Sequence, residues 1–210
     1  MKKFKFNNEN NIIQYELEEE SIKNIIKTIK SIGIVNIKSK FDSLIIKNES
    51  DLNKLENLVF NNEKKFKGKT LYRFTKDGID ITTIIDKINN KSNLLFLYLT
   101  GNKRIFGAFI KTKLENIEIG KFIKDENAFV FSLNNNKIYK IIKPENAIIF
   151  FKTNKIGIGN TRDKNGFYYD KEFINDSGLL FEPKIYDFKY KEELTEKDNK
   201  LKELEIFEIY

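Results

Sequence analysis

The segment DENAFVFSLNN, residues 125–135, joins a polar turn, an apolar core and a second polar turn. By the two-residue period of a strand, Phe129 and Phe131 share one face, while Val130 and Ser132 share the other. Neither face carries a charge, so both faces should be covered by other parts of the chain. The segment therefore predicts the central strand of a sheet that is packed on both sides.

Further strands flank this segment and together predict an antiparallel sheet. Residues 94–99 and 105–110 are apolar runs joined by a Gly-containing turn, which predicts a hairpin. Gly107 inside the second run indicates a bulge or a close approach of another backbone. Three more strands are predicted at 137–142, 147–151 and 201–210.

Two helices are predicted within the same part of the chain. Apolar side chains at positions 52, 55, 58 and 59 share one face of a helix that either Asn48 or Ser50 caps. A second helix covers residues 79–88, with apolar positions 81, 84, 85 and 88. It follows a strand at 71–74 and a turn at Asp77-Gly78.

The first forty residues are expected to form an extension. Alternation at residues 3–6 and 12–17 predicts a hairpin. Isoleucines at three- and four-residue spacing then predict an amphipathic helix that ends at Gly33, namely Ile22, Ile25, Ile26, Ile29 and Ile32. Packing of this helix on the hairpin or on the main domain is favoured over docking of a partner helix. We therefore divide the chain into an N-terminal extension, residues 1–40, and a main domain, residues 41–210.

Composition excludes several classes of active site. The 210 residues include no histidine and no cysteine, which rules out Ser-His-acid triads, cysteine nucleophiles and the usual zinc sites. Carboxylate, lysine, tyrosine or hydroxyl chemistry remains. No window approaches the roughly 18 apolar residues of a membrane span, so we expect a soluble, intracellular protein without membrane insertion.

The net charge is a weak basic signal. It is +7, from 38 basic and 31 acidic residues, and the two signs are interspersed as on a solvated surface. Arginine, whose forked side chain recognises phosphates and bases, occurs only at Arg73, Arg104 and Arg162. Binding to nucleic acid or to another acidic surface is therefore the least favoured of the functions considered.

Three sequence features resemble parts of known sites. Asp77/Asp80 and Asp125/Glu126 are closely spaced carboxylates of the kind used in acid–base catalysis, but 31 acidic residues produce such pairs by chance. Residues 156–160, Ile-Gly-Ile-Gly-Asn, would let backbone amides approach a phosphate, but they lack the remaining features of nucleotide-binding loops. A turn between strands is favoured there. No catalytic, cofactor-binding or metal-binding residue is predicted.

Four segments, taken in order, resemble one family. They are Leu-Tyr-Arg at 71–73 with Asp77-Gly78, Ile-Phe-Gly-Ala-Phe at 105–109, Asn-Ala-Phe-Val-Phe-Ser-Leu at 127–133, and Glu-Leu-Glu-Ile-Phe-Glu-Ile at 203–209. These segments are similar to signature motifs of the TLDc domain, and the similarity runs from about residue 41 to residue 210. The chain departs from the family pattern in having Ala108 for a second glycine, a displaced acid in residues 156–163, and no tryptophan before the central motif.

The resemblance implies an α+β, mainly β fold, in which a two-layer antiparallel β-sandwich is flanked by short helices. It implies a non-catalytic protein-interaction module, because no reaction is firmly attached to the domain. Family members are linked to oxidative-stress resistance, and several bind the peripheral sector of vacuolar-type proton pumps (V-ATPases). The expected partners are therefore pump subunits, met in the cytoplasm or at the surface of acidic organelles, with no cofactor. An enzyme of peroxide protection that uses carboxylate or lysine chemistry is the alternative.

Overall fold

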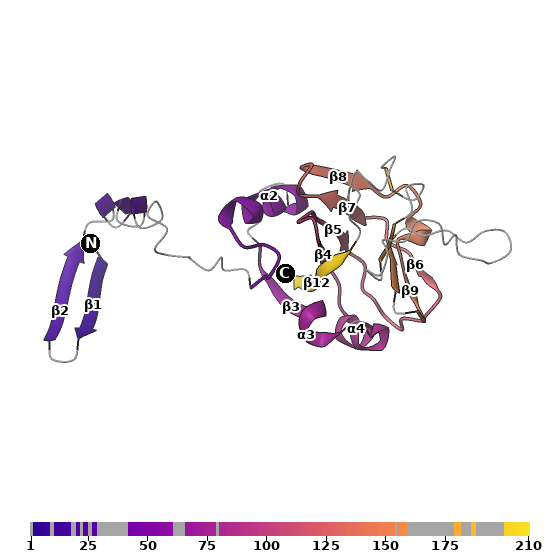
Figure 1. Ribbon diagram of the computed structural model, residues 1–210, viewed down its shortest axis with the longest axis horizontal. Helices are drawn as coiled ribbons and strands as arrows, with labels where there is room; N and C mark the ends of the chain where they lie inside the picture. Colours follow the sequence, from indigo (N-terminus) through magenta and orange to yellow (C-terminus); the bar gives the residue numbers. More distant parts are fainter. Residues whose placement is uncertain are drawn as a thin grey trace. The chain divides into compact units, whose positions relative to one another are not determined.

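The computed structural model describes residues 2–8, 11–17, 20, 21, 23, 24, 27, 28, 42–60, 66–78, 80–153, 155–158, 179–181, 186, 187 and 200–210 (Figure 1). Contacts divide the chain into two units, Met1–Lys38 and Ser39–Tyr210. In the first unit, β1 (Lys2–Asn8) and β2 (Asn11–Leu17) pair antiparallel, which confirms the predicted hairpin. The described residues between 20 and 28 are helical, and the five isoleucines of the predicted stripe lie outside the described residues.

The second unit contains a six-stranded antiparallel sheet in the order β3-β12-β4-β5-β7-β8. Its strands are β3 (Gly68–Arg73), β12 (Leu201–Ile209), β4 (Leu94–Thr100), β5 (Ile105–Ile110), β7 (Phe129–Ser132) and β8 (Lys137–Lys140). The middle positions belong to β4 and β5, so the prediction that residues 125–135 supply the central strand is wrong. An apolar pattern reports that both faces of a strand are covered, and it carries no information about the order of strands.

A smaller sheet forms the second layer, in the order β11-β10-β9-β6. Its strands are β11 (Leu179–Phe181), β10 (Lys155–Ile158), β9 (Ile148–Phe151) and β6 (Phe122–Ile123). Strand β10 pairs antiparallel with β9 but parallel with β11. The turn predicted at 156–160 is therefore wrong for residues 156–158, which form a strand, while residues 159 and 160 lie outside the described residues.

Short helices flank the sheets. Helix α2 (Glu49–Phe60) begins after Asn48, whose side-chain oxygen accepts a hydrogen bond from the Asp51 amide at 2.8 Å, so Asn48 is the cap. Helix α3 (Phe74–Asp77) and helix α4 (Ile81–Ile88) follow β3, and the 3-10 helix η1 (Pro144–Asn146) precedes β9. The predicted α+β, mainly β sandwich with short flanking helices is confirmed.

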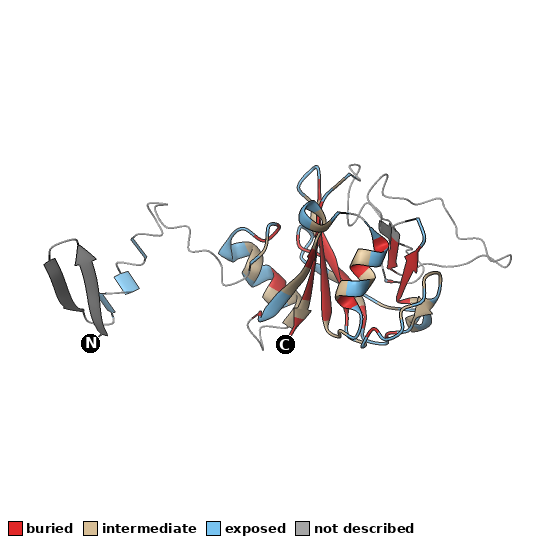
Figure 2. Ribbon diagram, turned by 90° about the horizontal axis from the view of Figure 1, so that it is seen from below, coloured by how far each residue is buried: buried red, intermediate tan, exposed pale blue. Residues whose placement is uncertain are grey.

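The six-stranded sheet is covered on both faces (Figure 2). Along β4, Phe96 and Tyr98 join a core that includes residues of α4 and of the second sheet. Leu95 and Leu97 point the other way, into a core that includes Leu55 of α2. Alternation along the strands therefore separates two cores, as the pattern of residues 129–132 predicts.

Candidate functional site

Two buried carboxylates on β12 fasten other segments to the sheet. Glu205 is fully buried, and it accepts hydrogen bonds from the Leu44 amide at 2.9 Å and the Ile45 amide at 3.3 Å. The Ser43 hydroxyl also donates to it, and Arg73 Nε lies 2.8 Å from its Oε1. Glu205 therefore joins the segment before α2 to strands β3 and β12.

Glu203, the second of these carboxylates, has a similar role two residues earlier. It is 4% exposed, and it accepts hydrogen bonds from the hydroxyl and the amide of Thr75 in α3. In the sequence, Glu203 and Glu205 alternate with Leu204 and Ile206, but this pattern gives no sign that the two acids are buried. Both carboxylates serve the architecture of the domain.

The closely spaced carboxylates Asp77 and Asp80 have two separate structural roles. Asp77 accepts from the Arg73 amide at 2.9 Å and lies 3.0 Å from Lys87 Nζ. Burial acts to raise the pKa of Asp77, but the hydrogen bonds from Arg73 and Lys87 hold it below its ordinary value. Asp80 caps α4, accepting from the Thr83 amide at 2.9 Å. Each carboxylate is held by its own donors.

The cap of α4 gives a prediction about pH. Hydrogen bonds from Thr82 and Thr83 lower the pKa of Asp80 from 3.8 to about 2. The stabilisation that this pKa shift provides is fully present above the ordinary pKa of Asp80. It is lost as the pH falls through the pKa that Asp80 has in the folded protein. Asp80→Asn keeps a capping oxygen but no longer titrates, so its deficit in unfolding midpoint relative to wild type should shrink from about pH 4 to about pH 2. Urea unfolding followed by circular dichroism at both pH values measures this, and a constant deficit would contradict it.

The neighbouring carboxylates Asp125 and Glu126 also have separate partners. Asp125 is 3% exposed and accepts hydrogen bonds from the amides of Lys111, Thr112 and Asn127. Glu126 is exposed and lies 2.8 Å from Lys124 Nζ. Asp125 therefore fixes the chain at the end of β5 and at the approach to β7.

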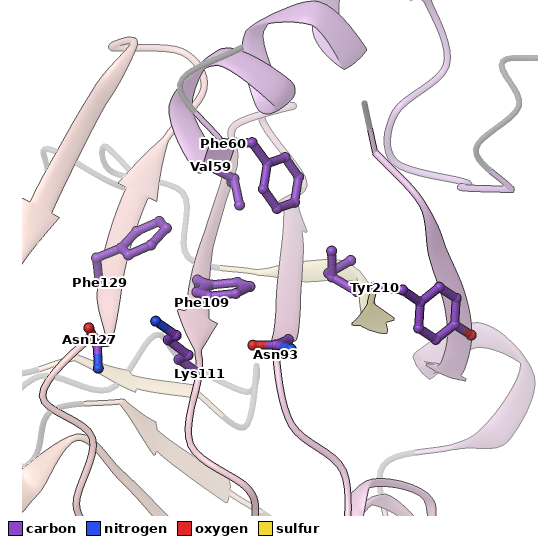
Figure 3. A pocket seen from close by; sticks show the side chains of 9 residues that line it. Val59, Phe60, Asn93, Phe109, Lys111, Asn127, Phe129 and Tyr210 are labelled. Carbon is purple, nitrogen blue, oxygen red and sulfur yellow. The ribbon is translucent and has the colours of Figure 1, made fainter. Parts of the chain in front are cut away.

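Two of the residues fixed by Asp125, Lys111 and Asn127, line a pocket of about 340 Å³ at one end of the six-stranded sheet (Figure 3). Strands β4 and β7 begin at this end, and β5 and β12 finish there. In Figure 3, Val59 and Phe60 extend from the last turn of α2 toward Phe109 and Phe129. Its full lining is Val59, Phe60, Asn93, Phe109, Lys111, Asn127, Phe129, Ile209 and Tyr210.

A second pocket of about 330 Å³ continues from the first toward β8. The two pockets share Val59, Asn127 and Phe129 in their linings, so they are neighbouring lobes of one surface. The second lobe adds residues of α2 and β8, including Leu58, Ile138 and Lys140. We call the two lobes together the α2 groove. Most of its lining side chains are apolar, and polar side chains lie among them, which is the usual character of a ligand-binding surface.

Among the described residues, no three acidic side chains come together in a way that could hold a metal ion. No described helix has both the length and the apolar character needed to cross a membrane.

The sequence model of the TLDc domain family matches residues 40–210 of the chain. The chain belongs to the TLDc domain family. No curated protein matches it. In this TLDc domain the four signature segments lie on or beside β3, β5, β7 and β12, all in the six-stranded sheet. Ala108, at the position of the family's second glycine, is fully buried in the core between the sheets.

Proposed function

We propose that this TLDc domain is a non-catalytic protein-interaction module that docks on the peripheral, ATP-hydrolysing sector of a vacuolar-type proton pump. The observation that carries the proposal is the family match across residues 40–210. Docking would take place in the cytoplasm, at the surface of acidic organelles that carry the pump. Support of oxidative-stress resistance would then follow from the state of the pump.

The hydrogen bonds of the acidic residues support a non-catalytic role. Glu203, Glu205, Asp77, Asp80 and Asp125 each accept hydrogen bonds from backbone amides of this fold. In Asp77 and in Asp125, both carboxylate oxygens already have partners within the fold, which leaves neither oxygen free to serve a substrate. These carboxylates act as structural hydrogen-bond acceptors, which favours a docking module over an enzyme.

Affinity purification tests the proposal directly. We expect the tagged full chain to recover pump subunits from native extract, enriched about ten-fold or more over an unrelated protein with the same tag. Mass spectrometry identifies the subunits, and binding of the purified chain to the isolated peripheral sector checks that contact is direct. Recovery of no pump subunit, together with no binding to the isolated sector, would remove this function.

A further inference from the structure

We propose that the α2 groove is the docking surface, and that it binds an extended segment of the partner in which apolar side chains alternate with acidic ones. This inference rests on the proposed function, because the segment is placed on the peripheral sector of the pump. The family match identifies neither the binding face nor the chemistry of the bound segment, and this inference proposes both.

The shape of the groove favours a chain segment. Each lobe alone lies at the low end of the volumes of small-molecule pockets, which are about 300–1,000 Å³. The lobes follow one another and share the wall made by Val59 and Phe129. In an extended peptide, residues i and i+2 point to the same side, so two apolar side chains can enter two successive lobes.

The floor of the groove is held in place before anything binds. The carboxylate of Asp125 fixes the backbone at Lys111 and at Asn127, and both residues line the first lobe. The rings of Phe109 and Phe129 stack with their centroids 5.4 Å apart. A preformed surface of this kind lowers the conformational entropy that binding would cost.

Charge at the edges of the groove selects the partner. Lys111 lies at the first lobe and Lys140 at the second, and both are exposed. In the part of the chain that the structure describes, no carboxylate pairs with either, whereas Glu126 at the same edge pairs with Lys124. Two uncompensated cations beside an apolar floor complement a segment that carries acidic residues between its apolar ones.

The ring geometry favours a peptide over a single-stranded nucleic acid. Nucleic-acid platforms present open aromatic faces on which bases stack. Here Phe109 and Phe129 are inclined by 26° and cover one face of each other. Asn93 and Asn127, which flank them, supply the amide groups that pair with a peptide backbone.

Charge reversal in the full chain tests the inference. The double variant Lys111→Glu/Lys140→Glu should bind the isolated peripheral sector about ten-fold more weakly than wild type, mainly through slower association at low salt. The matched control Lys47→Glu/Lys152→Glu changes the net charge equally at exposed sites outside the groove lining, and should bind like wild type. Circular dichroism confirms that both variants are folded.

The outcomes separate the two proposals. If wild type and the groove variant bind the sector equally, the groove is not the docking surface, although the proposed function stands. If wild type does not bind the sector, the proposed function falls, and a blocked peptide Asp-Phe-Asp-Leu-Asp then tests the groove alone. We expect this peptide to bind wild type with a Kd of about 1 mM or tighter and to shift the amide NMR signals of Asn127 and Phe129. No shift there, or a larger shift with single-stranded RNA, would overturn the inference.

Discussion

Replacing Glu205 with alanine is expected to lower the free energy of unfolding by about 3–5 kcal/mol, the usual cost of removing one partner of a buried ion pair. The carboxylate is fully buried, and the Arg73 side chain beside it is 17% exposed. Loss of the Glu205 carboxylate leaves Arg73 with only the exposed Asp42 as its partner among the described residues, and it removes the acceptor of the Leu44 and Ile45 amides. Urea unfolding of the full chain, followed by circular dichroism, measures the change.

The same strand supplies a matched control for Glu205. Glu208 pairs with Lys91 at 3.2 Å, but its side chain is 19% exposed and that of Lys91 is 37% exposed. Glu208→Ala should therefore cost about 1 kcal/mol or less, as ion pairs near solvent do. If Glu205→Ala cost no more than Glu208→Ala, the assignment of Glu205 as the central structural acceptor would be wrong.

The position of Glu205 explains how the start of the domain is held. Residues 42–48, the described segment before α2, form no strand, yet Ile45 and Ile46 within this segment are buried. Ser43 donates to Glu205 and in turn accepts from the amides of Ile45 and Ile46 at 3.0 and 2.9 Å. One carboxylate thus replaces the ladder that a strand would have supplied.

Most strands of this domain could be predicted because the pattern of apolar residues along a strand reflects which of its faces are buried. Residues 94–99 and 105–110 are apolar at nearly every position, and both form strands covered on two faces. The cap of α2 at Asn48 is likewise a local signal, since its partner, Asp51, lies three residues away. Features that depend only on residues close together in the sequence can therefore be predicted from it.

Features that depend on distant partners could not be predicted. Residues 156–158 suggested a turn because of Gly157, which instead pairs with Ile149 and Leu180 on neighbouring strands. Ser43, whose hydroxyl donates a hydrogen bond to Glu205, lies 162 residues from Glu205 in the sequence. No pattern within a few consecutive residues predicts the parallel pairing of β10 with β11 or the burial of an acidic side chain.

The α2 groove also depends on residues that are distant in the sequence, which is why no site residue could be assigned from the sequence. Val59, Lys111, Asn127 and Tyr210 come from four separate regions and meet only where strands of the six-stranded sheet begin and end. Asp125 did carry a signal, as an acid before an apolar strand. Its function is to hold Lys111 and Asn127, and only the fold distinguishes that role from acid–base chemistry.

Gly107→Ala is expected to destabilise the domain by about 3 kcal/mol, at the upper end of the usual cost of overpacking. A Cβ atom at Gly107 would lie 2.2 Å from the carbonyl oxygen of Phe96 on β4 and 2.5 Å from the ring of Phe131 on β7. The sequence prediction of a close backbone approach at this glycine is confirmed, and the approach occurs inside the sheet, where strands cannot separate cheaply. Urea unfolding of the full chain measures the loss. The reverse exchange at the next position, Ala108→Gly, should cost only about 1 kcal/mol.

A second substitution separates the two clashes at Gly107. Phe131→Leu shortens the ring side chain, so it should rescue Gly107→Ala if the ring is the main obstacle. The Phe96 oxygen is nearer and belongs to the backbone, which cannot rotate away as a side chain can. We therefore expect the double variant to recover little stability beyond the sum of the single effects, as a double-mutant cycle would report. A recovery of most of the loss would show instead that side-chain packing, rather than the spacing of β4 and β5, requires glycine here.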